Sequence, residues 1–212
     1  MVFFFVKVTM PGQPIVERFV ISPSNLPDPE TLRAWVKSAQ AGESEGQRLI
    51  YETFAGKMLL AIRRYIPGEQ EALDVLQDGF LKVFHNIGGY TFRGSFEGWM
   101  RRIMVNMSID ALRSSKQLQF VGESEEMLDV LSAKELEQSE PEWAALDHQD
   151  ILVAMEQLTP MYRAVFNLYA IEGYAHREIS EQLKISEGTS KSNYAKARRN
   201  LRELLREKLR KQ

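Results

Sequence analysis

Residues 173–201, GYAHREISEQLKISEGTSKSNYAKARRNL, predict two short helices separated by a tight turn. In a first helix over about residues 175–183, Ile179 and Leu183 share one face, because side chains four positions apart lie above one another on a helix. The segment KISEG then interrupts the pattern, and Ser186 is a residue type that caps helix N-termini. The stretch therefore predicts a helix-turn-helix.

The second helix of this motif is expected to be basic on its outer side. We expect Tyr194, Ala197 and Leu201 to face inward. This leaves the following residues outward, near or just after the helix N-terminus: Lys191, Ser192, Asn193, Lys196 and Arg199. Side chains at this position of a recognition helix reach base edges and phosphates in a major groove. A helical hairpin with a solvated basic face is the alternative that the motif alone leaves open.

The net charge of −2 conceals a separation of charge along the chain. Residues 186–212 hold nine Lys and Arg against three Glu, whereas residues 117–147 hold nine Asp and Glu against one Lys. A basic end of this kind is typical of a polyanion-binding surface. The local charge therefore favours DNA binding over a merely solvated hairpin.

Helical periodicity continues through most of the chain ahead of this motif. Apolar residues at three- and four-residue steps predict helices within residues 29–42, 43–66 and 69–87. A fourth helix is expected from near Ser95, which suits an N-cap, to about Ser115.

A break in this pattern divides the chain. Residues 117–142 are acidic and lack amphipathic regularity, which predicts a flexible linker. Helices resume within residues 144–158, and a further helix begins at Pro160, a residue suited to the first helical position.

The first 28 residues differ from the rest of the chain. Residues 1–28 contain four prolines and no long periodic pattern, which predicts an extended or poorly ordered arm. A short strand is expected there at VFFFVKV or VERFVI. The predicted fold class is all-α, with two small helical domains at residues 29–116 and 143–212 joined by the linker.

Residues 92–106, FRGSFEGWMRRIMVN, combine aromatic side chains, arginines and an asparagine around a turn. Such a stretch can be the core and rim of an ordinary helix, or a surface that holds nucleic-acid bases. On the helix from Ser95, one stripe is expected to face the domain core: Phe96, Met100, Ile103, Met107 and Ala111.

A second stripe of the same helix consists of Arg102, Asn106, Ile109 and Arg113. The arginines can bind phosphates, and the asparagine amide offers a donor and an acceptor to a base. Stacking on bases pulled out of a duplex is open to three residues in and beside the preceding turn: Phe92, Arg93 and Trp99. For the tryptophan taken alone, a position in the core is the more common outcome.

Several classes of protein are disfavoured by composition. The chain has no cysteine, which excludes disulfides and cysteine metal sites. Its histidines, His85, His148 and His176, are widely separated, and no metal-ligand spacing, phosphate loop or nucleophile motif occurs. We therefore predict no enzyme activity, cofactor or metal. The opening apolar run is too short for a signal peptide or membrane span, so we predict a cytoplasmic protein without membrane insertion.

Three stretches together resemble a known family. They are DVLQDGFLKVF at residues 74–84, FRGSFEGWMRRIMVNMSIDALR at residues 92–113, and REISEQLKISEGTSKSNYAKAR at residues 177–198. In this order, over about residues 30–208, the chain resembles a group IV (extracytoplasmic-function) sigma factor of bacterial RNA polymerase. SFEGWMRRIMVN and ISEGTSKSNYAKAR look especially like members from Bacteroidetes-type bacteria.

The resemblance implies a protein that binds core RNA polymerase, directs it to promoters through −10 and −35 elements, and promotes strand opening. Residues 29–116 correspond to sigma-70 region 2 and residues 143–212 to region 4. The implied partners are promoter DNA and core polymerase, through the clamp helices of its largest subunit and its beta flap. An anti-sigma factor is a further partner that the resemblance allows without requiring.

The resemblance also implies roles for particular residues. Three match the family's clamp-helix contact: Asp74, Gln77 and Asp78. The positions expected to bind and melt the −10 element are Phe92, Arg93, Trp99, Arg102, Asn106 and Arg113. Those expected at the −35 element are Thr189, Lys191, Ser192, Asn193, Lys196 and Arg199. A stand-alone helix-turn-helix regulator that does not need polymerase remains the alternative function.

Overall fold

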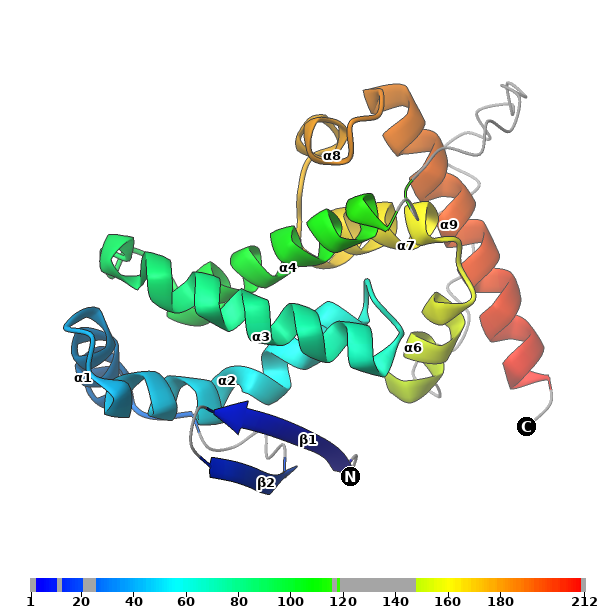
Figure 1. The fold of residues 1–212 in the computed structure, drawn as a ribbon. Coiled ribbons are helices and arrows are strands. Elements are labelled where there is room, and N and C mark those ends of the chain that lie inside the picture. The colour runs from blue at the N-terminus through cyan, green and yellow to red at the C-terminus, as the bar shows by residue number, and fades with distance from the viewer. Residues whose placement is uncertain (1–2, 11–12, 21–25, 116–117, 119–147, 211–212) are drawn as a thin grey trace. The chain divides into compact units, whose positions relative to one another are not determined.

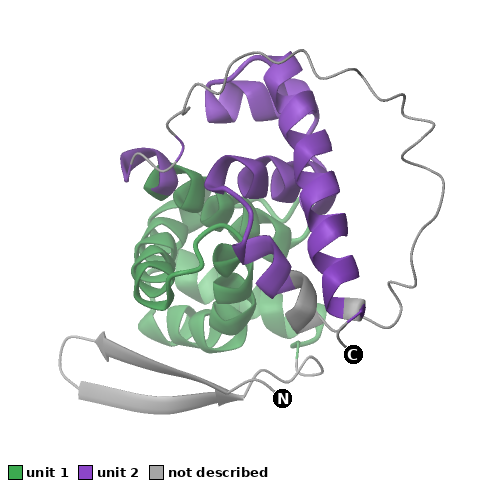
Figure 2. Cartoon of the chain, turned by 90° about the vertical axis from the view of Figure 1, so that its right-hand side faces the viewer, with its two compact units in different colours: residues 1–111 green, residues 112–212 purple. Residues whose placement is uncertain are grey.

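The chain forms two compact units, residues 1–111 and residues 112–212 (Figure 2). The computed structural model describes residues 3–10, 13–20, 26–115, 118 and 148–210. Apart from Leu118, the acidic linker predicted at 117–142 lies outside the described residues, and its flexibility stays a prediction.

Two strands lie in the N-terminal arm (Figure 1). β1 (Phe3–Met10) pairs with β2 (Gln13–Val20) as an antiparallel hairpin, in a register that sets Phe3 opposite Val20 and Met10 opposite Gln13. The two segments expected as alternative strands from the sequence are therefore the two halves of one hairpin.

The first unit continues as a set of helices. They are α1 (Pro29–Gln40), α2 (Ser44–Arg63), α3 (Glu69–Asn86), a 3₁₀ turn η1 (Ile87–Gly89) and α4 (Phe96–Ser114). The Asp28 carboxylate caps α1 by accepting from the backbone N–H groups of Glu30 and Thr31 at 3.0 Å each. Ser95 caps α4 as predicted, its Oγ accepting from the Gly98 N–H at 3.2 Å.

The core of this unit is formed by α2, α3 and α4. α1 packs on α2, and α2 packs on α3 (Figure 1). Ile50 and Met58 of α2 and Met100 of α4 are each fully buried. Gly79 of α3 lies directly against the Met104 sulfur, in the space that any larger side chain would need. The absence of a side chain at Gly79 therefore leaves room for the end of the Met104 side chain between α3 and α4.

The buried face of α4 differs from the predicted stripe. Phe96 and Met100 are buried as expected, but the rest of the face consists of Met104, Val105, Ser108, Ile109 and Leu112. Ile103, Met107 and Ala111 are only half-buried, and Ile109, expected outward, is 1% exposed. Apolar residues occupy every position from 103 to 105, so adjacent faces of the helix are almost equally apolar, and periodicity does not indicate which of them is buried. Met104, which packs on Gly79, belongs to the face that is buried.

The second unit is also helical in its described part. It comprises α6 (His148–Glu156), α7 (Pro160–Phe166), a π-helical turn η3 (Asn167–Ile171), α8 (His176–Leu183) and α9 (Glu187–Leu209). Its core joins α6 and α9 through Ala154, Met155, Leu158, Ala197, Leu201 and Leu205. Pro160 is the first residue of α7, as predicted, and Thr159 caps it.

The predicted helix-turn-helix is α8, the turn and the start of α9. Ile179 and Leu183 are buried, and Lys184 turns the chain with a left-handed φ of 56°. Ser186 caps α9, its Oγ accepting from the Thr189 N–H at 2.9 Å. The all-α class is confirmed for both predicted domains, with the hairpin ahead of them.

Candidate nucleic-acid and protein interfaces

The outer face of α3 combines polar and apolar groups. Asp74, Gln77 and Asp78 are all exposed on this face, as the sequence predicted. Leu81 follows on the same face and is 63% exposed, the most exposed of the large hydrophobic residues that the structure describes. An exposed leucine beside carboxylates and an amide suits docking on a protein surface that is both basic and apolar. Leu81 was not among the residues predicted from the sequence, although its spacing of four from Gln77 places both residues on one face of the helix.

The turn between α3 and α4 is held in a defined conformation. Phe92 and Gly94 both have left-handed φ values, 60° and 80°. The Tyr90 hydroxyl donates to the Gly94 carbonyl at 2.9 Å, and burial raises the pKa of this tyrosine. Gln40 of α1 donates through Nε2 to the carbonyls of Ile87 and Tyr90, each at 2.9 Å. These three hydrogen bonds hold the backbone of the turn that carries Tyr90 and Phe92.

An aromatic cluster surrounds Tyr90. Its ring centroid lies 5.2 Å from that of Phe92, 5.1 Å from that of Phe96 and 5.4 Å from that of Trp99. Phe96 stacks on Trp99 at 5.6 Å and 21°, and it is only 4% exposed. Phe92 and Trp99 are half-buried. The cluster therefore has a buried base of Tyr90 and Phe96, with two rings that also reach solvent.

Polar residues continue along α4 from this cluster. Arg102 and Asn106, one turn apart, are both exposed, and Arg93 is exposed in the turn itself. Arg113 lies in the last turn of the helix. The predicted helix face is thus correct for Arg102 and Asn106 and wrong for Ile109, which belongs to the core.

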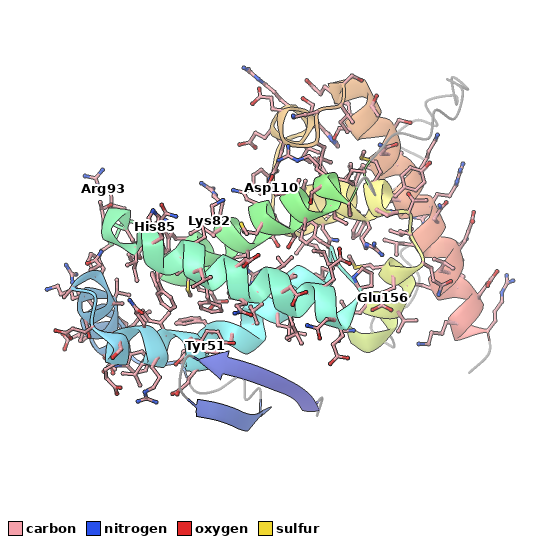
Figure 3. All side chains as sticks on the ribbon, viewed as in Figure 1. Tyr51, Lys82, His85, Arg93, Asp110 and Glu156 are labelled. Atoms are coloured by element: carbon pink, nitrogen blue, oxygen red, sulfur yellow. The ribbon has the colours of Figure 1, made fainter. Side chains whose placement is uncertain are left out.

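Lys82 and His85 of α3, which the sequence pattern did not single out, lie beside this surface. Figure 3 shows Lys82, His85 and Arg93 along one edge, with Asp110 farther along. Lys82 Nζ lies 3.6 Å from the sulfur of Met107 on α4, one residue from Asn106. No spacing in the sequence could indicate this, because the two helices meet only through tertiary packing.

The N-terminal part of α9 carries the second predicted surface. Lys191, Ser192 and Arg199 are exposed, and Thr189 and Lys196 are half-buried. Lys191 Nζ lies 2.7 Å from the Glu187 carboxylate, and this hydrogen bond lowers the pKa of Glu187. A cation in a surface ion pair can exchange its partner for a phosphate at little cost.

Asn193 is not part of that outer surface. It is 7% exposed, and its Nδ2 has no hydrogen-bond partner within the described residues. The prediction that Asn193 faces outward is therefore wrong. The inward stripe of α9 begins earlier than expected, with Ser190 at 0% exposed, and Asn193 and Ala197 continue it at steps of three and four.

A histidine joins three elements of the second unit. The His176 ring stacks on Tyr169 of η3, with centroids 4.3 Å apart at 12°, and its Nδ1 is hydrogen-bonded to Ser190 Oγ at 2.9 Å. Tyr194 contacts the Tyr169 ring at 4.5 Å. Burial, and then the charge of Lys191, lower the pKa of His176, while Glu187 acts in the opposite direction.

The described part of the chain offers neither a metal site nor a membrane span. Within it, no group of three or more His, Asp or Glu side chains could hold a metal ion. No helix there is long and apolar enough to cross a membrane.

Comparisons with known proteins match the two helical parts of the chain separately. The family model for sigma-70 region 2 matches residues 50–117, and a model for sigma-70 region 4 matches residues 148–201. The ECF RNA polymerase sigma factor SigL of Mycobacterium tuberculosis is 32% identical over 178 residues, which cover 82% of this chain and 97% of that protein. The chain belongs to the ECF sigma factors. The order of the two regions in this sigma factor is the predicted one, while the domain limits at 29–116 and 143–212 stay a prediction.

Other relatives share less of their length with this sigma factor. SigE of Mycolicibacterium smegmatis is 31% identical over 140 residues, 65% of this chain and 52% of that protein. The match to BldN of Streptomyces coelicolor, 29% identical, covers 80% of this chain and 64% of that protein. The chain thus spans between half and two thirds of the length of these two relatives.

Solved structures give further matches. One is the sigma factor RpoE from Bartonella quintana in complex with the anti-sigma factor NepR, with a TM-score of 0.46, 19% identity, and coverage of 75% of this chain and 96% of that one. Another is CnrH in complex with the cytosolic domain of CnrY, with a TM-score of 0.45, 21% identity, and coverage of 82% and 96%.

Proposed function

We propose that this sigma factor binds core RNA polymerase in the cytoplasm, directs it to promoters through −10 and −35 elements, and promotes strand opening. The observation that carries the proposal is that one chain of this family has two separate surfaces suited to DNA. The first is the aromatic turn with Arg102 and Asn106, and the second is the exposed start of α9. The finer likeness to Bacteroidetes-type members is part of the proposal and rests on SFEGWMRRIMVN and ISEGTSKSNYAKAR.

Strand opening in this proposal needs binding energy and no covalent chemistry. Pulling a base out of a duplex costs about a few kcal/mol, and stacking on an aromatic side chain returns about 1–3 kcal/mol per base. Phe92 and Trp99 supply half-buried rings, and Arg93, Arg102 and Arg113 supply charge for the adjacent phosphates. Asn106 offers an amide to a base edge.

Polymerase docking is proposed on the outer face of α3. Asp74, Gln77 and Asp78 would face the basic clamp helices of the largest subunit, and Leu81 adds an apolar contact at the same place. Region 4 is proposed to dock on the beta flap. Its −35 contacts are Thr189, Lys191, Ser192, Lys196 and Arg199.

Run-off transcription with purified core polymerase and genomic fragments tests the proposal. We expect transcripts that start at defined sites only when this chain is added. Core polymerase that stays inactive, together with sequence-specific DNA binding by the chain alone, would favour a stand-alone regulator instead. An anti-sigma factor remains a prediction, and co-purification of a tagged chain from its own cells is the measurement that checks it.

A further inference from the structure

Arg33 of α1 lies against the ring of Phe92 in the turn before α4. The guanidinium carbon is 4.7 Å from the ring centroid, within the range of a cation–π contact. Arg33 is exposed, and within the part of the chain that the structure describes no carboxylate is at ion-pair distance from it. The aromatic ring is therefore the partner that orients this arginine.

α1 holds the same turn at a second point. Gln40 lies seven residues after Arg33, so the two side chains share one side of the helix, two turns apart. The Gln40 amide donates to the carbonyls of Ile87 and Tyr90, at 2.9 Å each. Val36, between them, is 1% exposed and anchors this side of α1 in the core. α1 thus fixes both the start of the turn and the ring at its tip.

The ring needs such support because of its backbone. Phe92 has a φ of 60°, in the left-handed region that costs a non-glycine residue free energy. A residue in that region keeps its conformation only when the surrounding structure holds it. Among the described residues, the Phe92 ring has an aromatic contact with Tyr90, with centroids 5.2 Å apart, and a cation–π contact with the Arg33 guanidinium.

We propose that Arg33 is a positioning residue for base capture, which holds the Phe92 ring in the orientation that receives an extruded base. The inference rests on the proposed function and adds to it a residue outside the helices that carry the predicted −10 contacts. Arg33 acts through the ring and not on DNA directly. A planar guanidinium suits this task better than an ammonium group, because it stacks on an aromatic face.

A double-mutant cycle on strand opening tests the proposal. The probe is a promoter fragment recovered by run-off transcription with the wild-type protein, and opening by holoenzyme is followed by permanganate reactivity. We expect Arg33→Ala to slow opening about two- to fivefold. The Arg33→Ala, Phe92→Ala double variant should open no more slowly than Phe92→Ala alone, because the arginine acts through the missing ring.

Conservative and control variants isolate the cause. Arg33→Lys should recover only part of the loss, since it keeps the charge without the planar stack. Lys37→Ala removes an exposed cation one turn farther along α1 and should open like the wild type. The salt dependence of promoter binding should be unchanged in Arg33→Ala, because no phosphate contact is lost.

Three results would overturn the inference. They are wild-type opening by Arg33→Ala, losses that add in the double variant, and a reduced salt dependence, which would make Arg33 a phosphate ligand. A wild-type protein that supports no run-off transcript overturns the proposed function itself, and this is seen before any variant is compared.

Discussion

Phe92 and Phe96 are four residues apart, yet their surroundings differ sharply. Phe96 is 4% exposed, packs edge-on against Phe54 at 6.0 Å and lies beneath Trp99. Phe92 is half-buried, has left-handed backbone geometry and contacts an exposed arginine. The first side chain therefore contributes to the stability of the fold, and the second is available to a ligand.

Phe92→Ala should spare polymerase binding and impair strand opening. Loss of a stacking partner worth about 1–3 kcal/mol per base should slow opening roughly five- to a hundredfold. Permanganate footprinting on a duplex promoter measures the effect. A promoter with a preformed bubble should restore much of the signal, because the cost of opening has been removed beforehand.

Phe96→Ala is the matched comparison. Removing a buried phenylalanine should lower the free energy of unfolding by about 3–5 kcal/mol, visible as a lower melting temperature, and no bubble should rescue it. If Phe92→Ala opens the duplex as well as the wild type does, base capture by this turn is excluded.

Residue-level errors of the sequence analysis have one physical source. Periodicity identifies a helix face only where apolar and polar residues alternate clearly. On α4 three consecutive apolar residues, at positions 103–105, lie on different faces of the helix, and around Asn193 polar residues occupy both sides of the helix. The buried amide of Asn193 could not be anticipated, because a polar residue is expected outside unless tertiary contacts are known.

At the scale of single elements, α3 carries two groups of exposed side chains along one helix. Asp74, Gln77 and Asp78 lie near its middle, and Lys82 and His85 lie in its last turns. Joint reversal of Asp74 and Asp78 to Lys should abolish holoenzyme formation, because like charges would then face the basic clamp helices. Co-elution with core polymerase on a sizing column measures this, and circular dichroism should show unchanged helix content.

A second reversal controls for net charge. Glu203→Lys with Glu207→Lys on α9 gives the same charge change at two exposed positions also four residues apart. This control should still co-elute with core polymerase. Wild-type co-elution of the Asp74, Asp78 variant would remove α3 from the proposed docking surface.

The contact of η3, α8 and α9 at His176 predicts a pH dependence of stability. Burial lowers the pKa of His176 below its ordinary value of 6.5. As the pH falls, the histidine of the unfolded chain is therefore protonated before that of the folded chain. The contribution of His176 to the free energy of unfolding is fully present above pH 6.5 and is lost as the pH falls from 6.5 toward the pKa of the folded state. The urea concentration at the unfolding midpoint of the wild type should therefore decrease as the pH is lowered from 6.5 toward the folded-state pKa. Near-ultraviolet circular dichroism of the packed tyrosines measures this midpoint.

His176→Gln is the control for this effect, since it keeps a hydrogen-bonding side chain that does not titrate. Its midpoint should change less over the same pH range, and the difference between the two proteins isolates the histidine. Equal pH dependence in both would show that the stacking of His176 on Tyr169 does not govern its protonation.

Predictions of single elements were confirmed where the sequence contains a residue that caps the helix N-terminus. Ser95 and Ser186 cap helices in the structure as predicted, because N-capping depends on local residues that can be read directly. The pairing of β1 with β2 and the π-helical η3 depend on hydrogen bonds between partners that periodicity does not identify. The His176 contacts, which require η3, were missed for the same reason.

At the scale of the whole molecule, charge is divided along the chain in a way that suits dependence on polymerase. Residues 186–212 are basic, residues 117–147 are acidic, and the net charge is −2. Each of the two proposed DNA surfaces has only three cations among its expected contact residues, so neither alone would provide many phosphate contacts. Two weakly binding surfaces gain most affinity when core polymerase holds both of them against one DNA molecule, because binding of the second surface then becomes an intramolecular step.

We therefore expect the isolated chain to bind duplex promoter DNA only weakly, with a Kd of roughly 10⁻⁶ M or higher at physiological salt and little preference for sequence. Holoenzyme should bind the same fragment at least about a thousandfold more tightly. Fluorescence anisotropy with a labelled promoter and a scrambled control of equal length measures both, over a series of salt concentrations. Lys196→Ala should weaken binding of every promoter alike and reduce the salt slope by about one, as for a single phosphate contact. Tight, sequence-specific binding by the chain alone would contradict this division of labour, because it would mean that polymerase is not needed to bring the two surfaces onto DNA.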